Sequence, residues 1–277
     1  MAVSFSLEVF PPKNAAGSLS LWKAINIYEQ LEPDYISVTC HGSGSNSGFT
    51  NELVEAMSVR PRGTPVAPHM VCYGQSKEDI TKQLDTYKSY GIRNLVALRG
   101  DKRPGVEAGE FAHAVDLVKH VRELGHPFRV HVGGYPEGHP DSPDEASDLA
   151  HLKAKIDAGA DSIITQFFFD PDLFLRYRDR LDALGIKTPV IPGILPILDF
   201  DRVVSFASKC EATVPDFLHT MFSGGRSDQA EQQLLAMNVL THQITKLHLN
   251  GIEHFHFYTL NELTLTSQTC RWMKTAL

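Results

Sequence analysis

Polar side chains recur at the ends of short apolar runs in this sequence. The first run, FSLEVF at residues 5–10, carries Glu8 and stops at Pro11 and Pro12, which cannot donate hydrogen bonds to a sheet. Comparable residues in or just after the later runs are Thr39, His69, Arg99, Asp101, Tyr135, Glu137, His139, Gln166, Tyr258 and Asn261. Carboxyl groups can transfer protons, whereas arginine can hold anionic groups. Singly, each residue also fits a plain core or ion-pair role, but together they predict one shared site.

The elements that must position these residues alternate regularly along the chain. Strand-like runs lie at 5–10, 34–40, 66–72, 94–100, 128–135, 162–169, 189–195 and 254–260. Helical patterns between them include 76–90, 144–158 and 227–249, the first two followed by Gly91 and Gly159. Eight such units in about 250 residues favour a (β/α)₈ barrel, here a single domain over residues 1–277, whose strand ends converge on one mouth. A doubly wound open sheet is the alternative.

Composition argues against several classes of function. The net charge of -7 argues against a nucleic-acid partner, which needs a basic face. No run approaches the roughly 18 apolar residues that span a bilayer, and no signal peptide is recognisable, so we expect a cytoplasmic protein. The four scattered cysteines are expected to be reduced thiols.

Nucleotide and metal motifs are incomplete. Gly42 and Gly44 follow a strand, but Ser47 stands where a dinucleotide fingerprint needs its third glycine, and no phosphate-binding loop of the G-x-x-x-x-G-K-[ST] type occurs. His254 and His256 share one strand face without a recognisable third ligand. We therefore expect no metal, and read the two histidines as a hydrogen-bonded pair in the core.

Several longer motifs identify a family. The segments LEVFPPK (7–13), GIRNLVALRGD (91–101), GGYPEGHP (133–140), DLAHLKAKIDAGADSIITQFFFD (148–170) and HFYTLN (256–261) resemble the catalytic barrel of the methylenetetrahydrofolate reductases. The resemblance runs from about residue 4 to residue 270. It implies a (β/α)₈ flavoprotein that binds FAD and interconverts 5,10-methylenetetrahydrofolate and 5-methyltetrahydrofolate. Hydride transfer would follow a ping-pong mechanism in which NADH or NADPH is the other substrate. The resemblance also implies a homo-oligomer.

The resemblance assigns roles to individual residues. Glu8 corresponds to the general acid, for which we expect a raised pKa caused by Leu7, Val9 and a stacked flavin. Asp101 matches an aspartate beside both the flavin and the folate. The FAD-binding positions are Thr39, His69, Arg99, Gly100, Asp101, Ala114, Tyr135, His139, Asp148 and Lys155. Gln166, Phe222 and Tyr258 match substrate-binding positions, together with Glu8 and Asp101.

Two departures from the family pattern bear on the substrate. Cys40 and His41 replace an aromatic residue and a glycine after Thr39, and Glu262 replaces an arginine after HFYTLN. If Glu262 lies at the substrate mouth, a Glu262→Arg change should alter substrate affinity; if it lies in the first turn of a helix, the change should cost only stability. The alternative to an enzyme is a non-catalytic or partner-dependent flavin- or folate-binding homologue. Because Glu8, Asp101 and Gln166 are all present, we favour the enzyme.

Overall fold

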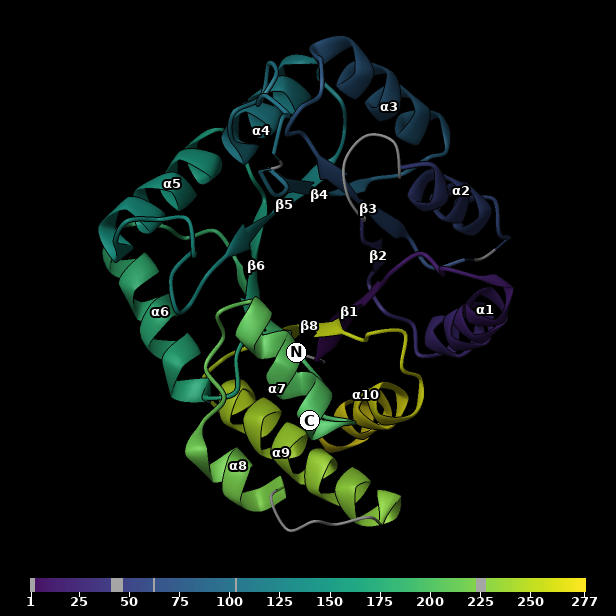
Figure 1. Ribbon diagram of the computed structural model, residues 1–277, viewed down its shortest axis with the longest axis vertical. Helices are drawn as coiled ribbons and strands as arrows, with labels where there is room; N and C mark the ends of the chain where they lie inside the picture. Colours follow the sequence, from purple (N-terminus) through teal and green to yellow (C-terminus); the bar gives the residue numbers. More distant parts are fainter. Residues whose placement is uncertain (1–2, 41–46, 62, 103, 223–227) are drawn as a thin grey trace.

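Eight parallel strands close into a barrel surrounded by helices (Figure 1). The computed structural model describes residues 3–40, 47–61, 63–102, 104–222 and 228–277. Each strand pairs with the next along the chain, and β1 pairs with β8, with Ser4 opposite His254 and Glu8 opposite Tyr258. This closing pair confirms the predicted barrel and excludes the open sheet.

The elements follow the predicted alternation. The strands are β1 (Ser4–Val9), β2 (Ile36–Val38), β3 (Val66–Val71), β4 (Asn94–Leu98), β5 (Arg129–Gly134), β6 (Ser162–Phe167), β7 (Val190–Ile194) and β8 (His254–Tyr258). The helices are α1 (Ala15–Gln30), α2 (Ser47–Ser58), α3 (Lys77–Ser89), α4 (Ala114–Glu123), α5 (Glu145–Asp157), α6 (Pro171–Ala183), α7 (Phe200–Lys209), α8 (Asp216–Phe222), α9 (Gln229–Leu249) and α10 (Thr264–Ala276). Among the described residues, no helix is both long and apolar enough to cross a membrane.

Local signals fix the ends of the helices that the sequence predicted. The side chain of Ser76 accepts a hydrogen bond from the Asp79 N–H at the start of α3, and Asp144 does the same for Ser147 at the start of α5. Gly159, just beyond α5, has a φ of 109°, which favours glycine. These caps place the strand-to-helix loops at the barrel mouth.

The barrel interior has an apolar part and a polar part. An apolar cluster inside the barrel comprises Tyr35, Ala67, Val96, Ile164 and Ile191. Along β1 and β8, in contrast, small hydroxyl groups and imidazoles meet in the buried interior, where Ser6 contacts His256. Because side chains alternate along a strand, Leu7 and Val9 point the other way and pack into the main core.

Candidate active site

The end of β1 that carries Glu8 is held by the segment that follows β8. The Thr259 hydroxyl donates to the Glu8 carbonyl oxygen at 2.6 Å. The Asn261 amide accepts from the Phe10 N–H at 3.0 Å and donates to the Phe10 carbonyl at 2.9 Å. The Asn261 side chain thus makes the two backbone hydrogen bonds that a neighbouring strand would make, just beyond the last pair of β1 and β8 at Glu8 and Tyr258. These bonds fix the position of Glu8.

Two imidazoles surround the Glu8 carboxylate. Its Oε2 lies 3.3 Å from His69 Nε2 and 3.7 Å from His256 Nε2, and its side chain is 17% exposed. Burial raises the pKa of Glu8, but the imidazoles of His256 and His69 lower it by more, to about 2. The expected rise in pKa is therefore wrong for this structure. Of the causes assumed for the rise, the apolar side chains of Leu7 and Val9 do not surround the carboxyl group, because they lie on the opposite face of the strand.

Glu8 lines a central cavity of about 280 Å³ at the barrel mouth. The other predicted site residues that line this cavity are Thr39, His69, Tyr135, Gln166 and Tyr258. The Tyr258 hydroxyl donates to the Thr165 carbonyl at 2.8 Å. A Cβ at Gly193 would lie 2.6 Å from the Tyr258 ring, so only glycine lets this ring lie where it does. The cavity is a small, partly aromatic chamber with one carboxylate.

Some residues of the central cavity could not be found from strand ends. Phe206 and Cys210 reach it from α7 and the residue that follows this helix, in a segment whose sequence offered no signal. His256 also lines it, although the sequence suggested only a core pair. The approach of His256 to Glu8 depends on closure of the barrel, which pairs β8 with β1.

A second cavity of about 360 Å³ adjoins the first and shares Leu98, Gly133 and Tyr135 with it. The predicted cofactor-binding residues that line it are Arg99, Gly100, Asp101, Ala114, Tyr135, His139, Asp148 and Lys155. We call this cavity the side cleft. The central cavity and the side cleft are therefore neighbours, with Leu98, Gly133 and Tyr135 bordering both.

The side cleft contains a buried cation. Lys155 Nζ donates to the Gly133 carbonyl at 2.7 Å, and burial lowers the pKa of Lys155 to about 8, although the Asp148 carboxylate opposes this shift. Burial likewise raises the pKa of Asp148. Arg99 donates to Asp141 at 2.6 Å at the rim. A buried ammonium of this kind can bind an anionic group that displaces water from the cleft.

The N-terminus of α4 supplies a second feature suited to an anion. His113, Ala114 and Val115 line the cleft, and the first N–H groups of a helix have no partner within the helix. Such termini attract phosphate groups. Gly100 has a φ of 85°, and a Cβ there would lie 2.2 Å from a Val71 methyl group, so this part of the cleft wall requires glycine.

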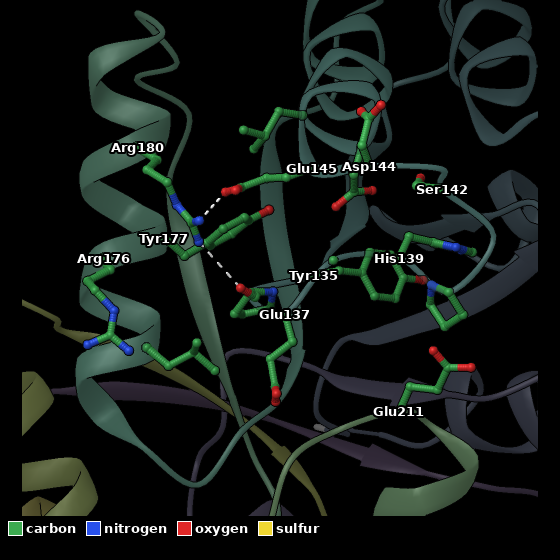
Figure 2. A pocket seen from close by; sticks show the side chains of 16 residues that line it. Tyr135, Glu137, His139, Ser142, Asp144, Glu145, Arg176, Tyr177, Arg180 and Glu211 are labelled. Carbon is green, nitrogen blue, oxygen red and sulfur yellow. Dashed lines mark hydrogen bonds and ion pairs between the residues drawn. The ribbon is translucent and has the colours of Figure 1, made fainter.

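A third cavity, of about 390 Å³, lies beside Tyr135 and His139 (Figure 2). The two rings contact each other, with centroids 4.5 Å apart. Arg180 on α6 binds the Glu145 carboxylate and approaches the Pro136 carbonyl at 3.4 Å. The carboxylates that line this outer cavity are Glu137, Asp144, Glu145, Asp148 and Glu211. This acidic lining is poorly suited to an anionic ligand, in contrast to the side cleft.

Comparison with known proteins agrees with this geometry. Residues 1–274 match the family described as methylenetetrahydrofolate reductase. The chain is 36% identical to the 5,10-methylenetetrahydrofolate reductase of Pectobacterium carotovorum over 97% of this chain and 89% of that protein. It is 35% identical to the enzyme of the same name from Escherichia coli, over 97% and 90% of the two chains. The chain belongs to the methylenetetrahydrofolate reductase family.

A solved structure shares the fold of this reductase family member at low sequence identity. It is an uncharacterized protein from Clostridium thermocellum that binds two copies of 5-methyl-5,6,7,8-tetrahydrofolic acid. The TM-score is 0.64 with 11% identity, over 99% of this chain and 94% of that one. This likeness supports the barrel alone.

Two predicted substrate-binding residues do not line the central cavity with Glu8: Asp101, which lines the side cleft, and Phe222. Phe222 ends α8, and its ring stacks on Phe200 with centroids 4.8 Å apart. It lines neither the central cavity nor the side cleft. Of the departures from the reductase pattern, Cys40 is partly buried, which raises its pKa, and His41 lies outside the described residues. No group of metal-ligating side chains suited to an ion is found in the described part of the chain.

Glu262 caps a helix in this reductase family member. Its two carboxylate oxygens accept hydrogen bonds from the N–H groups of Thr264 at 2.7 Å and Leu265 at 3.0 Å, at the start of α10. Its carbonyl oxygen accepts from the Tyr28 hydroxyl at 2.5 Å. The structure thus supports the helix role for Glu262, and its carboxylate lines neither the central cavity nor the side cleft.

We expect Glu262→Arg to lower stability and to leave the Michaelis constants unchanged. The change removes two hydrogen bonds and places a cation at the positive end of the helix dipole, which costs about 1–2 kcal/mol. Thermal unfolding should then shift down by a few degrees, with a smaller shift for Glu262→Gln, which keeps one acceptor. A changed Michaelis constant for folate with unchanged thermal stability would restore the substrate-mouth interpretation.

Proposed function

We propose that this protein is an FAD-dependent methylenetetrahydrofolate reductase that interconverts 5,10-methylenetetrahydrofolate and 5-methyltetrahydrofolate, with NADH or NADPH as the other substrate. The observation that carries the proposal is that two unlike cavities lie next to each other and share three lining residues. One holds a carboxylate with two imidazole neighbours, and the other holds a buried ammonium beside a helix N-terminus. A long ligand with an anionic part and a planar aromatic part fits this combination.

The side cleft suits the anionic part of FAD. Lys155 and the first N–H groups of α4 are suited to the diphosphate, and Arg99 can add a charged fork at the rim. Tyr135 borders both cavities, so it can contact the cofactor where its flexible part meets its ring system. Thr39 and His69 line the central cavity, where the flavin ring would lie.

The central cavity suits the folate half of the reaction. Opening the five-membered ring of methylenetetrahydrofolate requires a proton on the departing nitrogen, and Glu8 is the carboxyl group at the cavity wall. Because the pKa of Glu8 is lowered, Glu8 is ionised in the absence of ligand. It therefore acts by passing on a proton received from a neighbouring imidazole. FAD would supply the hydride-transfer chemistry when bound, and Gln166 and Tyr258, which line the same cavity as Glu8, would orient the folate.

Flavin spectroscopy tests this proposal and separates it from a non-catalytic binding homologue. The purified protein should retain FAD and show its absorbance bands. NADH or NADPH should bleach them, and methylenetetrahydrofolate should restore them. Retention of FAD without bleaching or recovery would identify a binding homologue, and no affinity for FAD would contradict the proposed cofactor.

Asp101 lines the side cleft and not the central cavity, and Asp101→Asn tests whether its carboxylate nevertheless reaches the flavin ring, as the family resemblance implies. A carboxylate near the pyrimidine side of the ring disfavours the anionic reduced form, so removing its charge should raise the midpoint potential. The cationic folate intermediate would also lose a counter-charge, which should slow folate turnover by roughly tenfold or more. Redox titration and stopped-flow reoxidation measure the two effects. An unchanged or lower potential would contradict this placement of Asp101.

A further inference from the structure

A line of polar side chains continues from Glu8 through the barrel interior, along the seam between β1 and β8. Ser4, Ser6 and Glu8 occupy alternate positions on β1, so they share the inner face of the barrel. The residues opposite them in register are His254, His256 and Tyr258. Barrel interiors are usually filled by branched apolar side chains, so a ladder of hydroxyls and imidazoles is an exception that requires a reason.

These side chains make consecutive polar contacts. His256 Nε2 lies 3.7 Å from Glu8 Oε2, and His256 Nδ1 lies 2.8 Å from Ser6 Oγ. Ser6 Oγ lies 3.1 Å from His254 Nε2, and His254 Nδ1 lies 3.0 Å from Asp34 Oδ2. Each imidazole thus uses one ring nitrogen toward Glu8 and the other toward Asp34. Rotation of the Glu8 carboxylate can shorten the one contact that exceeds hydrogen-bond length.

The two ends of this line differ in their access to water. The Asp34 side chain is 52% exposed, just before β2, whereas Ser6 and His256 are almost completely buried. Asp34 and Ser4 lie at the ends of the strands opposite to the mouth, where Glu8 is placed. At about 3.3 Å per residue, Ser4 and Glu8 are separated by roughly 13 Å along the barrel. The line therefore connects the floor of the central cavity with solvent on the opposite face.

We propose that this line of side chains is a proton path that recharges Glu8 from the N-terminal face of the barrel. The inference rests on the proposed function, because it supplies the proton that the folate half-reaction consumes. Ligands that fill the central cavity cover Glu8 from the mouth, and a route through the interior remains open while they do. Ser6, His254 and Asp34 then act as positioning and relay residues rather than as catalytic residues.

The transfer balances at every step. Glu8 gives its proton to the departing substrate nitrogen, while the reduced flavin gives a hydride to the one-carbon unit. The N–H bond at His256 Nε2 breaks as an O–H bond forms on Glu8, and His256 Nδ1 takes the Ser6 hydroxyl proton. One proton from solvent first gives His254 a hydrogen on both ring nitrogens beside the Asp34 carboxylate. His254 then passes its Nε2 hydrogen to Ser6, which restores the hydroxyl, and keeps the Nδ1–H that it donates to Asp34. One proton enters and one leaves in each turnover.

The surroundings favour a neutral His256 imidazole, which can both accept and donate. The Tyr35 ring lies against His131, His254 and His256, with centroids 4.8, 6.4 and 6.3 Å away. Burial lowers the pKa of His256. At the outer end, the contact with His254 lowers the pKa of Asp34, and Arg129 adds to the effect. Asp34 is therefore ionised near neutral pH and can attract a proton toward His254.

A second serine–histidine pair supplies a matched control. Ser162 Oγ lies 2.6 Å from His131 Nδ1, also buried within the barrel, and the other nitrogen of His131 lies 3.4 Å from Asn94. This pair has the same chemistry as Ser6 and His256, but the polar contacts of His131 are with Ser162 and Asn94, whereas the imidazoles next to Glu8 are those of His69 and His256. Ser162→Ala should therefore reproduce the packing cost of losing a buried hydroxyl without interrupting the proton path.

The first test is single-turnover reoxidation of the reduced holoenzyme by methylenetetrahydrofolate in H₂O and D₂O. Ser6→Ala should slow reoxidation by about tenfold or more and enlarge the solvent isotope effect. Asp34→Asn, an exposed change that the fold tolerates more easily, should act in the same direction. Flavin reduction by NADH or NADPH should keep its wild-type rate in both. Wild-type rates and isotope effects in both variants, or equal slowing in Ser162→Ala, would overturn the proton path.

The second test needs no turnover, so it separates failure of the proton path from failure of the proposed function. Histidine-labelled protein is titrated by nitrogen NMR. Titration of Asp34 at the outer end should shift the His256 Nδ1 resonance in the wild type and in Ser162→Ala, and this response should be lost in Ser6→Ala. A His256 resonance that is insensitive to the outer end in the wild type would contradict the path. A wild-type protein that is not reoxidised by methylenetetrahydrofolate would instead contradict the proposed function.

Discussion

Glu8→Gln is expected to abolish most of the folate half-reaction and to spare reduction of the flavin. Glutamine is nearly isosteric with glutamate, and the backbone of residue 8 keeps its hydrogen bond from Thr259. The amide cannot pass a proton from His256 to the substrate. Loss of a positioned proton donor typically costs 10²- to 10⁴-fold, so reoxidation by methylenetetrahydrofolate should slow by about that factor. Transfer from NADH or NADPH to the flavin needs no proton from Glu8.

Stopped-flow absorbance of the two half-reactions measures this separation directly. Glu29→Gln is a matched control, because Glu29 has a similar side-chain exposure of 16% and is paired with Arg60 outside the barrel. Glu29→Gln should lose the ion pair with Arg60 without affecting the rate of either half-reaction. A Glu8→Gln enzyme that is reoxidised at the wild-type rate would remove Glu8 from the proton transfer, and one that loses FAD would show that Glu8 has a structural role instead.

The barrel and much of its mouth could be predicted because the relevant signals are local. Each strand corresponds to a short apolar run. The helices α3 and α5 lie within the predicted ranges 76–90 and 144–158 and begin directly after their capping residues, Ser76 and Asp144. Once the topology is a barrel, the polar residue at each strand end must face a common mouth. This reasoning placed Glu8, Gln166 and Tyr258 at one cavity without any knowledge of their contacts.

The features that the sequence did not predict depend on contacts between distant segments. His256 approaches Glu8 only because β8 pairs with β1 across 248 residues of sequence, and that contact reverses the expected direction of the Glu8 pKa shift. Phe206 and Cys210 line the central cavity from a helical segment. The prediction used only residues at strand ends, so it could not find them. Glu262 was ambiguous in sequence because a carboxylate can cap a helix or face a ligand, and only the bonds to Thr264 and Leu265 distinguish the two.

Lys155→Met should weaken FAD binding by about 10- to 100-fold. A hydrogen bond to a charged group contributes about 1.5–3 kcal/mol, and methionine fills a similar volume without the charge. Lys153→Met is a matched control on the same helix, because Lys153 is half-exposed and pairs with Asp157 away from the cleft. The FAD affinity of Lys153→Met should equal that of the wild type. Equal affinities for Lys155→Met and the wild type would contradict the assignment of the side cleft to the anionic part of FAD.

The pH dependence of FAD binding supplies a sharper test of Lys155. Burial lowers the pKa of Lys155 to about 8 in the empty cleft, so the ammonium that attracts phosphate is present below pH 8 and is lost above it. The wild-type dissociation constant for FAD should therefore be flat below pH 8 and rise above it, by up to about tenfold per pH unit. Burial lowers the pKa of His139, so His139 titrates below this range, and Arg99 stays charged throughout it.

Lys155→Met should remove the rise above pH 8, and fluorescence titration of FAD between pH 6.5 and 9.5 would measure it. A wild-type curve without a break near pH 8, or a break that persists in Lys155→Met, would show that another group binds the phosphates.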